Sequence, residues 1–253
     1  AFGDLLSQPC DFSGYDEGAP VSGSEGFTMN TVEKNSAVVK AEPDGNKYLH
    51  VTKDGSSSLV LSYDFSGLVG ENSYTLEYRL KPVSGSCNML IGLDNSKGMV
   101  ISHSSNSNKF QYVKANKFTD AMTSVPKEQW YQIRMTVNQS TKTMDCYVDG
   151  VLLCADIDQR NGDPVTNRFT VFVSGNGTAF GLDDFKVYSG ELAAQRIEAV
   201  SLDFGGFQAN DLGTLPASKV AVTMPNLDAG SIVQYDSVDG TFGKAADDQS
   251  FYL

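Results

Sequence analysis

The sequence has few basic residues and no long apolar run. Its 253 residues include 19 Lys and Arg against 31 Asp and Glu, which gives a formal net charge of -12 at pH 7. This charge disfavours binding to the phosphate backbone of nucleic acid and to anionic membrane surfaces. No apolar stretch approaches the length of a membrane-spanning helix. We therefore expect no nucleic-acid partner and no membrane insertion.

The first ten residues also lack the charged start and apolar centre of a signal peptide. We expect that any signal peptide has already been removed. Abundant Gly, Ser, Asn and Asp between short alternating runs are typical of a secreted all-β protein with many turns. The composition therefore predicts a secreted or cell-surface protein.

Residues that usually carry catalysis are scarce. The sequence has two histidines, His50 and His103, and neither lies beside a carboxylate in the chain. Nucleophile elbows, phosphate-binding loops and paired-cysteine metal motifs are absent from the sequence. Hydrogen bonding or contact with solvent is the expected role of both histidines.

The four cysteines match no zinc-site spacing, and a chain of this length can bury a core without disulfides. They are Cys10, Cys87, Cys146 and Cys154. A two-residue turn at Asp149 and Gly150 would set Cys146 opposite Leu153 and turn Cys154 to the other face of the sheet. A bridge between Cys146 and Cys154 would then need a bulge. We therefore expect reduced, buried cysteines.

The clearest structural pattern lies in residues 130–154. Apolar and polar residues alternate over 131–137 and again over 144–148, which is the period of a strand with one buried face. Asp149 and Gly150 then supply the positive-φ dipeptide of a tight hairpin. The stretch predicts three consecutive antiparallel strands.

Similar runs on both sides of this stretch predict an all-β meander. The cleanest run is 73–81, which Pro82 is expected to end. The other predicted strands are 37–40, 47–53, 59–65, 89–93, 99–102, 110–113, 168–174 and 178–188. Residues 12–31 are expected to be irregular and to wrap the edge of the sandwich, and no long helix is expected before Ser189.

The pattern changes after Ser189. Residues 189–196 are polar and helix-tolerant, and new strands are predicted at 197–204, 220–224 and 232–235. We therefore expect one domain over residues 1–189 and a small β module, incomplete or immunoglobulin-like, over 190–253. Because the chain stops on the strand-like sequence of residues 251–253, we expect it to be part of a longer protein.

Four stretches of the first domain carry a family resemblance. They are residues 11–12, 74–79, 130–150 and 181–188. Together they resemble the laminin-G-like branch of the concanavalin A-like lectin/glucanase superfamily. The resemblance implies a jelly roll, in which two curved antiparallel sheets pack face to face and glycans bind on the concave face or at loops along its rim. This architecture hosts lectins, glycan-binding modules, hydrolases and lyases, so it does not by itself define a function.

Alternation assigns one set of polar and aromatic side chains to the wet faces of the strands. Such a surface suits sugars, because flat rings stack on C–H faces and planar charged groups bind paired hydroxyls. The predicted ligand-binding residues are Glu77, Arg79, Trp130, Gln132, Arg134, Asp145 and Tyr147. The simpler interpretation is that they are ordinary solvated strand residues, since one face of an antiparallel sheet commonly meets water.

The catalytic strings implied by the superfamily are missing. Its laminarinase-type hydrolases carry Glu-x-Asp-x-x-Glu on one strand, and its alginate-lyase branch uses Gln-Ile-His with a Tyr and an Arg. The sequence contains neither string. Glu77 and Asp145 are a candidate pair of carboxylates, but retaining glycoside hydrolysis needs about 5 Å between them, which the sequence does not fix. We therefore favour a non-catalytic protein and assign no catalytic residue.

The resemblance also implies a structural calcium ion. In related jelly-roll modules, acidic residues of the opening and closing strands bind calcium together with backbone carbonyls and hold the chain ends together. Asp11, Asp183 and Asp184 stand at the matching positions, and their oxygen atoms suit calcium. The alternative is that these aspartates serve turns. No other cofactor is expected.

The leading hypothesis is a secreted, non-catalytic carbohydrate-binding or adhesion module of a multi-domain extracellular protein. It would bind a glycan or a cell-surface partner by stacking and hydrogen bonding on a preformed face. One alternative is a glycoside hydrolase or polysaccharide lyase with an unrecognised catalytic set. Another is a structural spacer that only positions other domains of the same polypeptide.

Overall fold

The protein folds into an antiparallel β-sandwich followed by a smaller C-terminal unit. The computed structural model describes residues 3–8, 10–20, 26–30, 34–162 and 164–191, and four short strands beyond them. Contacts divide the chain into Ala1–Ala193 and Ala194–Leu253. The first unit contains two seven-stranded antiparallel sheets. The all-β antiparallel sandwich predicted from the sequence is therefore confirmed.

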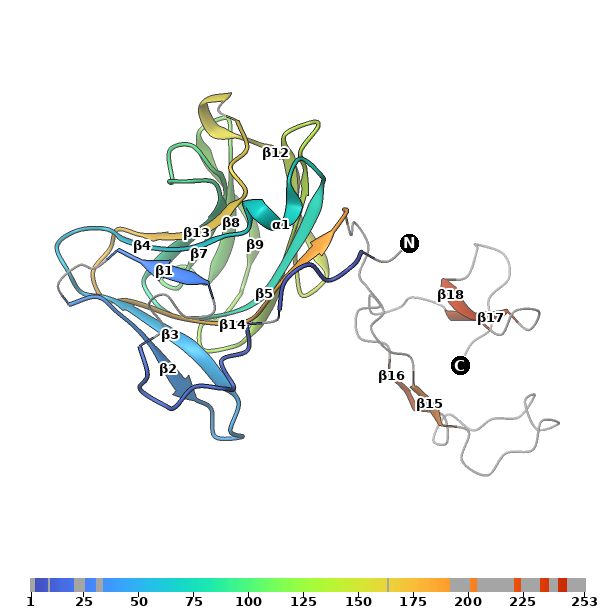
Figure 1. Ribbon diagram of the computed structural model, residues 1–253, viewed down its shortest axis with the longest axis horizontal. Helices are drawn as coiled ribbons and strands as arrows, with labels where there is room; N and C mark the ends of the chain where they lie inside the picture. The colour runs from blue at the N-terminus through green and yellow to red at the C-terminus, as the bar shows by residue number, and fades with distance from the viewer. Residues whose placement is uncertain are drawn as a thin grey trace. The chain divides into compact units, whose positions relative to one another are not determined.

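The two sheets form two layers (Figure 1). Sheet I contains, in spatial order, β12 (Val151–Asp158), β11 (Thr143–Val148), β10 (Tyr131–Asn138), β5 (Tyr74–Ser84), β14 (Thr178–Ser189), β3 (Lys47–Lys53) and β2 (Ser36–Ala41). Sheet II contains β1 (Phe27–Met29), β4 (Leu59–Asp64), β13 (Arg168–Val173), β6 (Ser86–Ile91), β7 (Met99–Ser104), β8 (Lys109–Lys114) and β9 (Lys117–Thr123). A short helix, α1 (Ser66–Val69), and a 3₁₀ turn, η1 (Arg160–Gly162), lie in connections.

Apolar side chains of the two sheets meet in one core. Aromatic rings link the layers, because Tyr78 of β5 packs on Phe169 of β13 at 4.8 Å between ring centroids, and Phe169 packs on Phe185 of β14 at 5.3 Å. All three side chains are buried, and burial of such a side chain contributes roughly 1.5–3 kcal/mol. Strand alternation turns Tyr78 and Phe169 inward, and the register shift between Asp183 and Lys186 turns Phe185 inward as well.

The prediction that Pro82 ends its strand is wrong, because β5 continues to Ser84. Pro82 lies opposite Phe180, next to a register shift between Ala179 and Phe180. On the other side of β5, the pairing with β10 begins only at Leu80. Proline is tolerated at a bulge or a free edge because no ladder bond needs its missing N–H.

The N-terminal segment lies beside β14. Isolated bridges join Leu5 to Tyr188 and Cys10 to Phe185, and a third joins Pro20 to Val38 of β2. The N–H of Cys10 donates to the carbonyl of Phe185 at 3.0 Å, and the N–H of Phe185 donates back at 3.2 Å. These backbone bonds place Asp11 close to the strand that carries Asp183 and Asp184.

In the C-terminal unit, β15 (Ser201–Asp203) pairs with β16 (Ala221–Thr223), and β17 (Val233–Asp236) pairs with β18 (Thr241–Lys244). Three of these strands overlap predicted ones, and β18 was not predicted. The helix-tolerant segment after Glu191, the rest of the proposed immunoglobulin-like module and the C-terminal residues 251–253 lie outside the described residues.

Candidate functional site

The seven predicted ligand-binding residues share the outer face of sheet I or its edge. Pairing of β10 with β5 sets Gln132 opposite Arg79 and Arg134 opposite Glu77. Pairing of β10 with β11 sets Arg134 opposite Tyr147. Register therefore creates cross-strand rows of polar and aromatic side chains on this face.

Glu77 and Arg134 form a buried ion pair in the middle of this face. The Nε of Arg134 donates to Oε1 of Glu77 at 2.8 Å, and its second terminal nitrogen lies 2.6 Å from the same oxygen. Only 4% of the Glu77 side chain and 7% of the Arg134 side chain are exposed. Because a buried charge is costly unless it is paired, each of these charges is committed to the other. Both residues therefore belong to the framework of the face.

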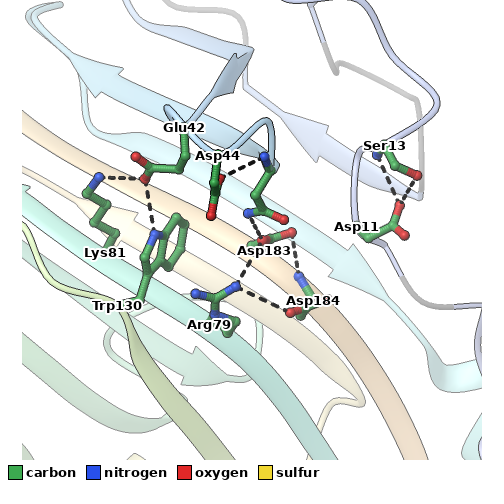
Figure 2. A network of polar contacts seen from close by, with 10 residues as sticks. Asp11, Ser13, Glu42, Asp44, Arg79, Lys81, Trp130, Asp183 and Asp184 are labelled. Atoms are coloured by element: carbon green, nitrogen blue, oxygen red, sulfur yellow. Dashed lines mark hydrogen bonds and ion pairs between the residues drawn. The ribbon is translucent and has the colours of Figure 1, made fainter.

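Trp130 is the aromatic centre of the more open part of the face (Figure 2). Its ring meets Tyr48 edge to face at 5.2 Å, and the guanidinium of Arg79 lies 4.8 Å from its centroid. The indole N–H donates to Oε1 of Glu42 at 3.1 Å, and the same oxygen accepts from Lys81 at 2.6 Å. The half-buried indole is therefore held in one orientation by Tyr48, Arg79 and Glu42.

Gly181 of β14 makes room for the two rings. A Cβ atom at this position would lie 2.9 Å from Cδ2 of Tyr48 and 3.1 Å from Cη2 of Trp130. Glycine inside a strand weakens the strand and often marks a close approach to the backbone. Here the close approach is that of Tyr48 and Trp130 to β14.

Asp183 and Asp184 of β14 oppose Arg79 on the same face. One terminal nitrogen of Arg79 lies 3.6 Å from Oδ2 of each aspartate. Asn46 donates to Oδ2 of Asp183 at 2.9 Å. Burial, together with the neighbouring charge of Asp184, raises the pKa of Asp183 to about 6. Its charge therefore changes under mildly acidic conditions.

Both histidines are buried. His50 lies opposite Gly181, and burial, with the charges of Lys40 and Lys81, lowers its pKa to about 4. His103 lies in sheet II, where its Nε2 is 3.3 Å from the carbonyl of Val125 and burial lowers its pKa. Both rings are therefore neutral at pH 7 and belong to the packed structure rather than to an acid–base site.

The candidate carboxylate pair is not arranged for retaining glycoside hydrolysis. Strand β10 lies between β5, which carries Glu77, and β11, which carries Asp145. The two strands are therefore about 10 Å apart, twice the usual strand spacing. Glu77 is neutralised by Arg134, and Asp145 accepts the N–H of Asp156 at 2.8 Å. The face thus provides no argument for this chemistry.

Of the three aspartates predicted to bind calcium, Asp183 and Asp184 share Arg79 as a partner, whereas Asp11 bonds to Ser13. Asp11 accepts the N–H of Ser13 at 3.0 Å and its hydroxyl at 2.8 Å, and these bonds lower the pKa of Asp11. Figure 2 shows Asp11 and Ser13 apart from the cluster around Asp183. The guanidinium of Arg79 beside Asp183 and Asp184 disfavours a divalent cation.

Within the described ranges, no group of three or more His, Cys, Asp or Glu side chains is arranged to hold a metal ion. Asp11, Asp183 and Asp184 do not form such a group, and the calcium site, which would also use backbone carbonyls, stays a prediction from the sequence. Backbone hydrogen bonds between Cys10 and Phe185 already hold the N-terminal segment against β14.

Three residues around Trp130 were not predicted. Tyr48 is next to Leu49 on β3, so its side chain lies on the face of the sheet opposite to that of Leu49. Lys81 lies two residues from Arg79 on β5, so the two side chains share a face. The period of two residues along a strand could therefore have placed both Tyr48 and Lys81. Glu42 lies in the connection between β2 and β3, and its sequence surroundings give no sign that it meets Trp130.

No described helix has the length and apolar composition needed to cross a membrane.

No curated protein matches the sequence. The solved structures include a sialidase with a TM-score of 0.57 and 11% identity, matched over 74% of this chain and 19% of that one. The chain thus corresponds to about a fifth of the sialidase, and the likeness shows a shared fold.

Two further structures resemble the chain more weakly. Domain 4 of AbnA, a GH43 extracellular arabinanase from Geobacillus stearothermophilus solved with arabinotriose, has a TM-score of 0.48 and 14% identity over 76% of this chain and 95% of that one. The CBM22-1 xylan-binding domain of Paenibacillus barcinonensis Xyn10C has a TM-score of 0.40 and 15% identity over 75% and 96%.

The family comparison rests on sequence and is independent of these structures. Residues 53–198, more than half of the chain, match a laminin-G family of the concanavalin A-like lectin/glucanases superfamily. The match begins at the end of β3 and includes the described strands from β4 to β14. The chain belongs to the concanavalin A-like lectin/glucanases superfamily.

Proposed function

We propose that the N-terminal sandwich is a non-catalytic carbohydrate-binding module that holds a glycan on the outer face of sheet I, around Trp130. The observation that carries the proposal is the fixed indole, which Tyr48, Arg79 and Glu42 hold at the edge of a polar face. A preformed aromatic ring with polar groups beside it is the arrangement that binds the C–H face and hydroxyls of a sugar.

The polar groups beside Trp130 are accessible enough to contact a ligand. Gln132 is exposed, and 35% of the Arg79 side chain is exposed. Tyr147 lies opposite Arg134, four residues along β10 from Trp130, which corresponds to about 13 Å along the strand. Two half-buried rings at this spacing favour a short oligosaccharide segment over a single sugar.

The superfamily itself includes lectins, so glycan binding is within its known range. We further propose that the protein is secreted or displayed on the cell surface and is part of a longer multi-domain chain. Weak binding at one site would then be strengthened by neighbouring modules of the same polypeptide.

A glycan array with matched variants tests the proposal. The wild-type chain should bind plant- or animal-derived oligosaccharides. Trp130→Ala should lose at least tenfold in affinity, because stacking and its supporting contacts are worth about 1.5 kcal/mol. Tyr147→Ala should bind more weakly than wild type. Phe118→Ala removes an exposed ring of sheet II and should bind normally.

The outcomes separate the candidate functions. Circular dichroism establishes that each variant is folded before its affinity is compared. If the wild-type chain binds no glycan, the module proposal fails and the structural spacer is favoured. If Trp130→Ala binds as tightly as wild type while Phe118→Ala does not, the ligand site has been placed on the wrong sheet.

A further inference from the structure

Two cysteines that the sequence predicts to be offset lie directly opposite each other. Pairing of β11 with β12 sets Cys146 opposite Cys154, while Tyr147 pairs with Leu152. The register shifts between these pairs, so β12 carries one extra residue, Leu153. The prediction that Cys154 lies on the other face of the sheet is therefore wrong, and the bulge is the physical reason.

Both cysteines belong to the apolar core of the sandwich. Cys146 and Cys154 are buried free thiols, and Leu153 beside them is also buried. Burial, together with the neighbouring Cys154 side chain, raises the pKa of Cys146. Directly opposed residues of antiparallel strands have Cα atoms about 4.5–5.5 Å apart, within the range of about 4.4–6.8 Å that disulfides span.

The backbone on either side of the pair is irregular. A second register shift lies between Met144 and Cys146, and Asp156 nearby has a φ of 52°. The carboxylate of Asp145 accepts the N–H of Asp156 at 2.8 Å. A bulge disrupts the hydrogen-bond ladder locally, so fewer backbone bonds oppose the small adjustment that a bridge needs.

The other two cysteines have different neighbours. Cys10 pairs with Phe185, and Cys87 pairs with His103. Strand register therefore brings together one cysteine pair out of the four residues.

We infer that Cys146 and Cys154 form a disulfide that ties β12, the edge strand of sheet I, to β11 when the chain folds with a disulfide oxidant such as oxidised glutathione. One cysteine thiolate attacks the glutathione disulfide and releases one glutathione thiolate. The second cysteine thiolate attacks the mixed disulfide and releases the other. Two electrons pass to glutathione, and the two cysteine protons are taken up by the released thiolates.

Oxidation takes place before β12 is fully packed, because both sulfur atoms are buried in the folded sheet. Once formed, the bridge is shielded from reductants for the same reason. The bridge fixes β12, which is the edge strand of sheet I and pairs only with β11 in that sheet. Val151 and Leu152 of this strand are about half exposed. The inference is independent of glycan binding.

Peptide mapping of the whole chain tests the inference. The protein is unfolded, refolded in a glutathione redox buffer and alkylated without reduction in guanidinium chloride. Trypsin then releases residues 143–160, which contain both cysteines and no internal Lys or Arg. This peptide should be unalkylated and lighter by two hydrogens than its reduced form. Cys10 and Cys87 should be alkylated.

Alkylation of both Cys146 and Cys154, or a bridge from either of them to Cys10 or Cys87, would overturn the inference. Thermal unfolding gives a second readout. The oxidised wild type should melt roughly 5 °C above its reduced form. This difference should disappear in Cys154→Ala and persist in the control Cys87→Ala. Equal melting temperatures of the oxidised and reduced wild type would show that the bridge does not tie β12 to the sheet.

Discussion

Gly181 controls how closely two aromatic rings approach β14. Gly181→Ala places a methyl group about 3 Å from Tyr48 and Trp130, so the rings or the strand must move. We expect the variant to lose about 1–3 kcal/mol in its free energy of unfolding. Trp130 is the single tryptophan of the chain, so a shift in its fluorescence should accompany the loss measured by urea unfolding.

Gly175→Ala is the matched control for this substitution. Its new methyl group would have Thr178 Oγ1 as its nearest neighbour, at 3.7 Å, which is ordinary contact. We expect little change in fluorescence or stability. If the two variants have the same stability and fluorescence, the close approach of the two rings does not explain why position 181 is glycine.

Asp183 makes the stability of the sandwich depend on pH. Its folded pKa is about 6, whereas an unfolded Asp titrates near about 3.9. The folded state therefore holds the proton more tightly. The resulting stabilisation is complete below about pH 4 and is lost as the pH rises through about 6, a change of about 3 kcal/mol.

Asp183→Asn should remove this dependence. Relative to wild type, the variant should gain stability between about pH 4 and 6 and show a constant difference at higher pH. Urea unfolding in the presence of EDTA measures the effect without bound metal. In the comparison variant Asp184→Asn, which keeps Asp183, most of the pH dependence should remain, because burial is the larger cause of the raised pKa of Asp183. If the difference in free energy of unfolding between Asp183→Asn and wild type does not vary with pH, the raised pKa of Asp183 is not the source of the pH dependence.

At the scale of elements, the Glu77–Arg134 pair joins β5 to β10 on the outer face. Arg134→Met leaves the carboxylate of Glu77 buried without its cation, and we expect a loss of about 3–5 kcal/mol in the free energy of unfolding. Glu77→Leu combined with Arg134→Met removes both charges and should recover most of the loss. Equal stability of the single and double variants in urea would refute this account.

Most strands could be predicted because their signals are local. The alternation over residues 131–137 and the dipeptide of Asp149 and Gly150 determine side-chain direction and turn geometry within a few residues. The bulges of β12 could not be predicted in this way, because no neighbouring residue marks the extra one. Strand β9 was missed since its side chains are mostly exposed and do not alternate.

The site was less predictable than the strands because its contacts come from distant segments. The alternation along each strand placed Arg79 and Gln132 on the outer face. It could not show that Glu77 and Arg134 form a buried ion pair between two strands. Glu42 bonds to Trp130 across 88 positions of sequence. Such contacts depend on the register and packing of the whole sheet.

At the scale of the whole molecule, the sandwich has its own core. The buried apolar residues of its main cluster lie between Cys10 and Val187, and both seven-stranded sheets lie in the unit Ala1–Ala193. A domain with a separate core commonly folds alone. We therefore expect a chain of residues 1–193 to unfold cooperatively at the same urea midpoint as the full chain.

Trp130 fluorescence measures both chains with the same probe, because the tryptophan lies in the N-terminal unit. The shortened chain should also bind the same glycans with the same affinity as the full chain, since the proposed site uses residues of sheet I and the connection between β2 and β3. A lower midpoint in the shortened chain would mean that residues 194–253 stabilise the sandwich. A lower glycan affinity at an unchanged midpoint would mean that they contribute to the ligand site.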